Sequence, residues 1–248
     1  MRRTIVLLFS TLFLVCNVAI SGNEFWEKKD YSQWTQRECN KMLENSPWAK
    51  TYSIRSFDSC EYRVQFRSAL PIRMAIVRSM QIASNYDKLS SEHRQEFDKR
   101  ADEYLSTNFP DRIVVHLIGG TNSDNIDAPV RLNMDLRRYW QNKTTELLKN
   151  TVFLVPAKGN RIPLLKYNVS QGDKCELQFI FPRQHQGLPA LGPEDKSFKL
   201  EFDYPIFGTE GNSLKQDSDY PRRSYIGNQR VFIEFKADKM LFNGKLEY

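Results

Sequence analysis

The chain has 248 residues, of which 40% are apolar and 27% are charged. This length and composition suit a folded globular protein of one large or two small domains, and they exclude long disordered stretches. The formal net charge is +6, and it falls to about +4 if Arg2 and Arg3 leave with a cleaved leader (6 minus 2). The basic residues occur as short pairs such as Arg137-Arg138 rather than as one clustered face, which argues against a nucleic-acid-binding protein.

The first 21 residues form the most specific pattern in the chain. Arg2 and Arg3 precede an apolar run over residues 5–20, and Ala19 and Ser21 are the small residues that a signal peptidase needs before Gly22. The pattern predicts a secretory signal peptide and an exported protein, periplasmic or extracellular. Two alternatives stay open, an uncleaved membrane anchor and a lipid-anchored form modified at Cys16.

The rest of the chain contains no other stretch that is long and apolar enough to span a membrane. We therefore expect a soluble mature body. It would touch a membrane only through an uncleaved signal or a lipidated Cys16.

Residues 22–150 predict a helical and mixed α+β region. Thr35 as N-cap with Glu38 three residues later is a capping box, and it predicts a helix that runs to Glu44. Strands are predicted over residues 49–56, 62–66 and 112–118, and the last of these is apolar enough for burial on both faces. Apolar spacing predicts further helices over residues 70–82, 90–109 and 130–148.

Three cysteines remain after removal of the leader. Because exported proteins meet an oxidising environment, we predict a disulfide between Cys39 and Cys60, which would close a loop of about 20 residues and stabilise the fold by roughly 3 kcal/mol. Cys175 is then predicted to be a buried thiol. No C-x-x-C pair is present, so neither a thiol-redox motif nor a zinc knuckle is expected.

Residues 151–248 predict a series of strands joined by polar turns. The apolar runs lie at residues 152–155, 162–169, 175–181, 198–204, 231–235 and 240–248. The predicted fold class is α+β, with an N-terminal helical and mixed region followed by a C-terminal antiparallel β-sandwich-like region.

Two long polar connections in the β-rich region are the predicted binding surface. Residues 183–196 contain His185, and residues 208–227 contain Tyr220, Arg222 and Arg223. Long loops on a rigid sheet are common binding sites, although they can equally be spacers. These four residues are the candidate ligand-binding residues.

No catalytic, cofactor or metal signature is present, and we predict no cofactor and no bound metal. Gly119-Gly120 lacks the rest of a phosphate loop, and none of the three histidines, His93, His116 and His185, has a partner at metal-ligand spacing. The remaining weak candidates are oxygen-rich or acidic clusters, namely Asn122, Asp124, Asn125 and Asp127, Asp217 and Asp219, Glu194 and Asp195, and Glu201 and Asp203.

The start of the mature chain carries a recognisable pattern: Phe25-Trp26-Glu27-Lys28-Lys29-Asp30-Tyr31, then Glu38-Cys39, then Ser46-Pro47-Trp48. Here the chain resembles the beginning of an uncharacterised family of exported bacterial proteins, to which no activity is assigned. The resemblance implies export and a shared fold, and it supplies no functional residue.

The sequence therefore predicts a non-catalytic binding or interaction protein of the bacterial cell envelope. Its partner would be an envelope protein or an extracellular ligand. Two alternatives remain, a secreted hydrolase of an envelope or extracellular polymer that uses His185 or the scattered acids, and a structural envelope component.

Overall fold

The N-terminal helices follow the capping signals of the sequence. A computed structural model describes residues 24–54, 60–121, 127–158, 160–170, 175–192, 195–209 and 223–248, and the predicted signal peptide and Cys16 lie outside them. The Thr35–Glu38 capping box is formed, and Ser90 accepts the backbone N–H of His93 at the start of α4. The helices are α1 (Phe25–Lys28), α2 (Gln36–Glu44), α3 (Leu70–Ala83), α4 (Ser91–Ser106), α5 (Asp127–Gln141) and α6 (Thr145–Leu148).

The single helix predicted over residues 130–148 is two helices, α5 and α6. The Thr144 hydroxyl accepts the backbone N–H of Leu147 and so begins a new helix, after the first has ended at Gln141. Competition between a Thr side chain and the helix backbone explains the break, because such side chains favour caps over helix interiors. Short 3₁₀ turns complete the helical elements at η1 (Tyr31–Gln33), η2 (Tyr86–Lys88) and η3 (Ala237–Lys239).

The larger sheet combines strands from both halves of the chain. All of its neighbours are antiparallel, in the order β1-β2-β3-β4-β8-β7. Its strands are β1 (Asn45–Ser46), β2 (Ala49–Ile54), β3 (Cys60–Phe66), β4 (Arg112–Thr121), β7 (Lys166–Val169) and β8 (Glu176–Pro182). Because β4 pairs with β8, the predicted boundary at residue 150 does not separate two sheets.

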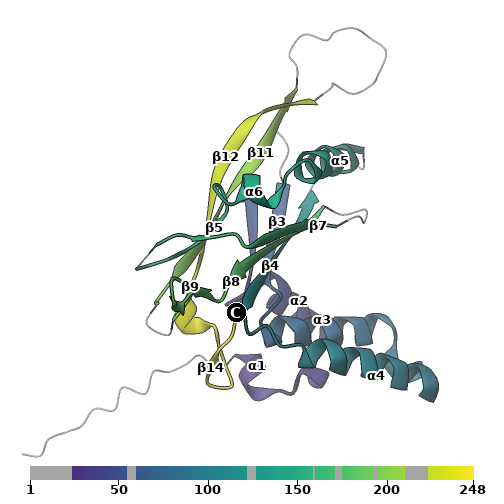
Figure 1. The fold of residues 1–248 in the computed structure, drawn as a ribbon. Helices are drawn as coiled ribbons and strands as arrows, with labels where there is room; N and C mark the ends of the chain where they lie inside the picture. The colour runs from purple at the N-terminus through teal and green to yellow at the C-terminus, as the bar shows by residue number, and fades with distance from the viewer. Residues whose placement is uncertain are drawn as a thin grey trace, which may run out of the picture.

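A second sheet of four strands lies in the order β12-β11-β5-β6, and it is also antiparallel. Its strands are β5 (Phe153–Pro156), β6 (Ile162–Pro163), β11 (Phe198–Thr209) and β12 (Arg223–Phe235), and β11 and β12 form a long ribbon that extends past the rest of the sheet (Figure 1). Two small hairpins complete the fold, β9 (Gln184–His185) with β10 (Leu188–Pro189), and β13 (Leu241–Phe242) with β14 (Lys245–Leu246). The fold is therefore α+β with antiparallel sheets, as predicted.

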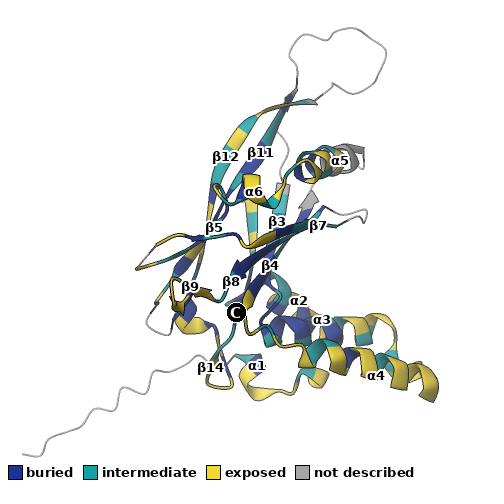
Figure 2. Cartoon of the chain, in the orientation of Figure 1, coloured by how far each residue is buried: buried dark blue, intermediate teal, exposed yellow. Residues whose placement is uncertain are grey.

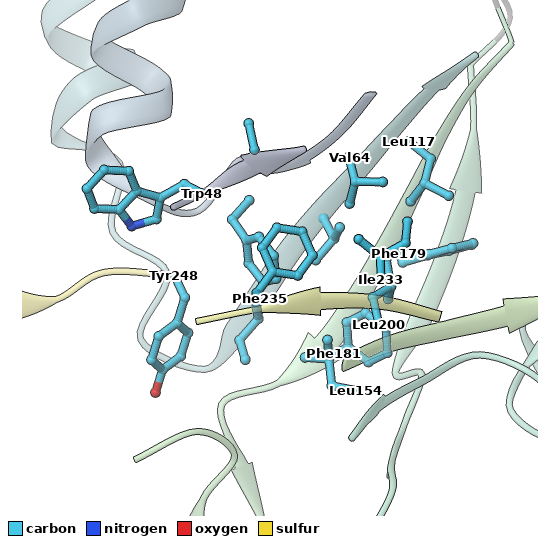
Figure 3. Close-up of a cluster of buried hydrophobic side chains, with 14 of the residues drawn as sticks. Trp48, Val64, Leu117, Leu154, Phe179, Phe181, Leu200, Ile233, Phe235 and Tyr248 are labelled. Atoms are coloured by element: carbon cyan, nitrogen blue, oxygen red, sulfur yellow. The ribbon is translucent and has the colours of Figure 1, made fainter. Parts of the chain in front are cut away.

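The core lies between the two sheets and is rich in aromatic side chains (Figure 3). Phe66 of β3 contacts Phe198 and Phe235 of the second sheet with ring centroids 5.6 and 4.9 Å apart, and all three side chains are essentially inaccessible to solvent. At one end of the same interface the hydroxyls of Tyr62 and Tyr204 hydrogen-bond to each other. Each large apolar side chain buried in this way contributes roughly 1.5–3 kcal/mol, so the packing of sheet on sheet holds the fold together.

Helices α2, α3 and α4 lie beside the larger sheet, and α4 is the most exposed of them (Figures 1 and 2). Arg73 of α3 is 95% buried (5% exposed), and its guanidinium donates to the carbonyls of Tyr104, Leu105 and Thr107 at the end of α4. These carbonyls have no partner inside the helix. Arg73 therefore fixes the end of α4 and the chain that follows it.

The predicted Cys39–Cys60 disulfide is not formed, because Cys39 is a free, buried thiol. Cys39 faces Arg78 and Ser79 of α3, and burial raises the pKa of its thiol. Cys60 lies at the other end of β3 from Gln65, which donates to the Leu43 carbonyl of α2. Five residues of strand place Cys60 about 17 Å from Gln65, which is the β3 residue that contacts α2. A disulfide with Cys39 of α2 would need Cα atoms within about 7 Å of each other. Cys175 is buried, as predicted.

Candidate functional site

The face of the larger sheet that points away from the core carries a row of polar side chains. Strand side chains alternate between faces, so on β4 the residues Ile113, Val115 and Leu117 enter the core while His116 points outward. The strand registers align one outward residue from each of four neighbouring strands. The row is Gln65, His116, Gln178 and Asn168, on β3, β4, β8 and β7.

The next row along the same face has an apolar middle and a cation at each end. Val114 of β4 is opposite Ile180 of β8, which in turn is opposite Lys166 of β7. Arg67 follows β3 directly, and its backbone N–H donates to the Val114 carbonyl at 2.8 Å, so it continues the row on the other side.

Apart from Gln65, whose amide donates to the Leu43 carbonyl of α2, these two rows form the floor of a cleft with a volume of about 430 Å³. Tyr104 and Phe109, from the end of α4 and the segment before β4, line one wall, and Arg112 adds a third cation. No carboxylate lines the cleft among the described residues. Its lining is Arg67, Tyr104, Phe109, Arg112, Val114, His116, Lys166, Asn168, Gln178 and Ile180.

The hydrogen bonds of the polar row assign the tautomer of His116. The Asn168 amide Nδ2 donates to Gln178 Oε1 at 2.6 Å, and Gln178 Nε2 lies 2.9 Å from His116 Nε2. An amide nitrogen can only donate, so His116 Nε2 accepts and the ring proton is on Nδ1. His116 Nδ1 is buried and has no hydrogen-bond partner in the described chain.

The Arg67 side chain presents a second donor of the same kind. Its Nε–H is buried without a hydrogen-bond partner in the same described ranges. Burial, and then the charge of Arg67, lower the pKa of His116 from 6.5 to about 4. The ring is therefore neutral at pH 7, and two residues that line the cleft each have a buried N–H donor without a partner in the described chain.

Arg183 contacts the segment that contributes Phe109 to the wall of the cleft. Its guanidinium donates to the Phe109 carbonyl and to the Tyr248 carbonyl, and it lies 4.6 Å from the centre of the Tyr248 ring. Arg73 contacts the other side of the same segment, with its guanidinium 5.4 Å from the Phe109 ring. Two arginines thus position the irregular segment between α4 and β4 that contributes Phe109 to the wall.

The four predicted ligand-binding residues are not gathered by the described structure. His185 is half-buried on the β9–β10 hairpin, whereas Arg223 begins β12 at the far end of the β11–β12 ribbon (Figure 1). Tyr220 and Arg222 lie outside the described residues, as does most of the loop over residues 208–227 that contains them.

The predicted acidic pair on β11, Glu201 and Asp203, forms ion pairs with arginines. Arg230 donates to Asp203 at 2.9 Å and to Glu201 at 3.0 Å, and Arg161 also pairs with Glu201. Asp195 accepts the Gly192 backbone N–H in a local turn. These contacts explain the three acids as structural groups.

The possible metal ligands Asn122, Asp124 and Asn125, as well as Asp217, Asp219 and Glu194, lie outside the described residues, and the Asp127 side chain is not described. Within the ranges given above, no group of three His, Cys, Asp or Glu side chains could hold a metal ion.

A second cavity lies between α3 and α4 and has a volume of about 410 Å³. Ile76, Met80 and Phe97 give it an apolar lining, and the third histidine, His93, lies at its edge. Glu96 and Arg100, which also line it, pair with each other. This cavity offers no buried polar group without a partner, so it is less informative than the cleft.

Sequence reasoning missed the cleft, because its residues are ordinary side chains spread over five segments. The alternation Arg112, Val114, His116 was present within β4, yet the apolar run around it predicted burial on both faces. The prediction holds for most of the strand, since Val114 and Ile118 are buried, but His116 is part of a polar row. Only the strand register brings Gln178 and Asn168 beside it.

Comparison of the chain with protein-family models, with curated proteins and with solved structures gives no match. The function must therefore be argued from the cleft itself.

Proposed function

We propose that this protein is an exported, non-catalytic binding protein whose cleft on the larger sheet takes a small anionic ligand. One observation carries the proposal: two residues that line the cleft, Arg67 and His116, each have a buried N–H donor without a partner, in a lining with three cations and no carboxylate. A buried donor without an acceptor costs about 1–3 kcal/mol. An anion accepts from both donors, so binding recovers this cost.

The charges of the cleft support an anion over a neutral ligand. Arg67 and Lys166 have no acidic partner within the described chain, and Arg112 lies 3.4 Å from Asp111 in an ion pair that is half exposed on both sides. Like charges on one surface repel each other and raise the local concentration of ions of opposite sign. Hydrogen bonds to a charged acceptor are also stronger than neutral ones.

Binding fits the cleft better than acid–base hydrolysis. His116 uses its basic nitrogen to accept from Gln178, so it has no lone pair to offer as a general base. The described lining contains neither a Ser, Thr or Cys nucleophile nor a carboxylate. The acids that the hydrolase alternative would need on β11 are held by Arg230.

Export and a place in the bacterial envelope belong to the proposal and rest on the N-terminal sequence pattern. In the structure, none of the helices in the described ranges is both long and apolar enough to cross a bilayer.

Calorimetric titration of the mature chain with inorganic phosphate, sulfate, acetate and benzoate tests the proposal. We expect at least one of these anions to bind and Arg67→Gln to weaken its binding at least tenfold. Arg138→Gln is the matched control, because Arg138 is an exposed arginine on α5 outside the cleft, and it should leave the affinity unchanged. Equal affinities for the two variants would overturn the proposal, and so would a failure of these anions and of the longer carboxylates octanoate and suberate to bind.

The hydrolase alternative makes a different prediction. It expects turnover of an envelope polymer that is lost in His185→Ala, since His185 was its predicted catalytic group. A ligand that binds in the cleft and is recovered unchanged, with the same affinity in His185→Ala, favours the binding protein.

A further inference from the structure

The cleft has two positively charged ends with an apolar floor between them. Arg67 and Lys166 are at opposite ends of the row that contains Val114 and Ile180. Three interstrand spacings separate the two positions, which is about 14 Å between their backbones. The two cations therefore enter the cleft from opposite sides of its apolar middle.

The two ends also differ in chemistry. At the Arg67 end, two directed N–H donors are buried, which suits an acceptor that is held in a fixed orientation. At the other end, Lys166 is exposed and offers a mobile point charge beside the Asn168 amide. Between them Val114 and Ile180 are 5% and 8% exposed, and they present aliphatic surface to whatever lies above them.

Resting on the proposed function, we infer that the ligand is an elongated dianion with two acidic groups joined by an apolar spacer. One acidic group accepts from Arg67 Nε–H and His116 Nδ1–H. The spacer lies on Val114 and Ile180, against the wall that Tyr104 and Phe109 form. The second acidic group pairs with Lys166.

The size of the cleft agrees with this class of ligand. A volume of about 430 Å³ lies within the range of pockets that hold small organic molecules, roughly 300–1,000 Å³, and exceeds what one inorganic oxyanion needs. The choice of Lys166 over Arg112 for the second acidic group rests on competition, because Arg112 already has Asp111 as a partner.

Titration with aliphatic acids of matched length tests the inference. The probes are suberate, which has a carboxylate at each end, octanoate, which has one, and acetate, which has no spacer. We expect suberate to bind at least tenfold more tightly than octanoate, and octanoate more tightly than acetate. The first difference measures the second acidic group, and the second difference measures the apolar floor.

The variant Lys166→Gln locates the second acidic group. It should reduce the affinity for suberate to that for octanoate while octanoate itself binds as before. Lys99→Gln, at an exposed lysine of α4 outside the cleft, should change neither affinity. Thermal unfolding of each variant checks that it is folded.

The outcomes separate this inference from the proposed function. If suberate and octanoate bind equally well, or if Lys166→Gln weakens both alike, the dianion inference fails and the anion-binding cleft stands. If none of the acids, phosphate or sulfate binds, both fail.

Discussion

The two faces of the larger sheet are built from the same strands but differ in burial and charge. The inner face closes on the second sheet, and its aromatic side chains are fully buried against Phe198, Phe202 and Phe235. The outer face holds the cations of the cleft and the polar row, and two N–H donors there, one on Arg67 and one on His116, have no acceptor in the described chain. Alternation along one strand therefore gives one face to the core and leaves the other face for the proposed binding cleft. It predicts that inner-face substitutions cost folding free energy and outer-face substitutions cost affinity.

The largest expected effect is on the inner face. Phe66→Ala removes a ring that packs edge-on against the stacked rings of Phe198 and Phe235 and leaves a cavity, so we expect it to lower the free energy of unfolding by about 3–5 kcal/mol. Phe232→Ala is the matched control, because Phe232 is 50% exposed on β12, and it should cost less than about 1 kcal/mol. Urea unfolding of both variants measures the difference. Similar losses would show that the space between the sheets is not the main core.

Arg73→Met tests the support behind the cleft. The variant leaves three carbonyls at the end of α4 without their donor, so we expect a loss of about 2–4 kcal/mol in unfolding free energy. Arg73→Lys keeps the charge but cannot reproduce the fork of donors, and it should fall between Met and the parent protein. Chemical unfolding gives the ranking. A stable Arg73→Met variant would mean that solvent satisfies these carbonyls.

The lowered pKa of His116 on the outer face makes the free energy of unfolding sensitive to acid. Its pKa in the folded chain, about 4, lies below the usual 6.5, so the unfolded chain gains a proton first as the pH falls. The contribution of His116 to the free energy of unfolding should therefore be constant above about pH 6.5 and decline between there and about pH 4, by at most about 3 kcal/mol. His116→Gln keeps a neutral donor and should remove this part of the decline. Urea unfolding at about pH 5 and about pH 7 compares the two proteins, and identical slopes would contradict a buried, neutral His116.

The smallest expected effect on stability comes from the cations of the cleft. Arg67→Gln and Lys166→Gln each remove one charge from a group of like charges, so without ligand the free energy of unfolding should change by less than about 1 kcal/mol or rise slightly. Thermal unfolding at low ionic strength provides the measurement. A large destabilisation would show that these side chains stabilise the fold. It would contradict the expectation that outer-face substitutions affect affinity rather than folding free energy.

Local signals predicted much of the secondary structure correctly. The Thr35–Glu38 capping box, the Ser90 cap and the helix over residues 70–82 are formed, because they depend on neighbours within one helical turn. The predicted strand over residues 112–118 is the core of β4. The long-range assignments were poorer: the predicted disulfide is not formed, since Cys39 of α2 is a free thiol, and the predicted β-rich region shares its strands β7 and β8 with the N-terminal sheet.

The sequence by itself determined the capped helix starts at Thr35 and Ser90, the strand alternation and the α+β class, since each of these depends on side chains a few residues apart. It also determined the N-terminal pattern on which the expectation of export rests. Only the tertiary structure decided that His116 lies between Gln65 and Gln178, and that Arg67 and Lys166 end the same row. The physical reason is that strand register is set by the packing of whole faces. A cleft made from single residues of several strands therefore leaves no local pattern in the chain.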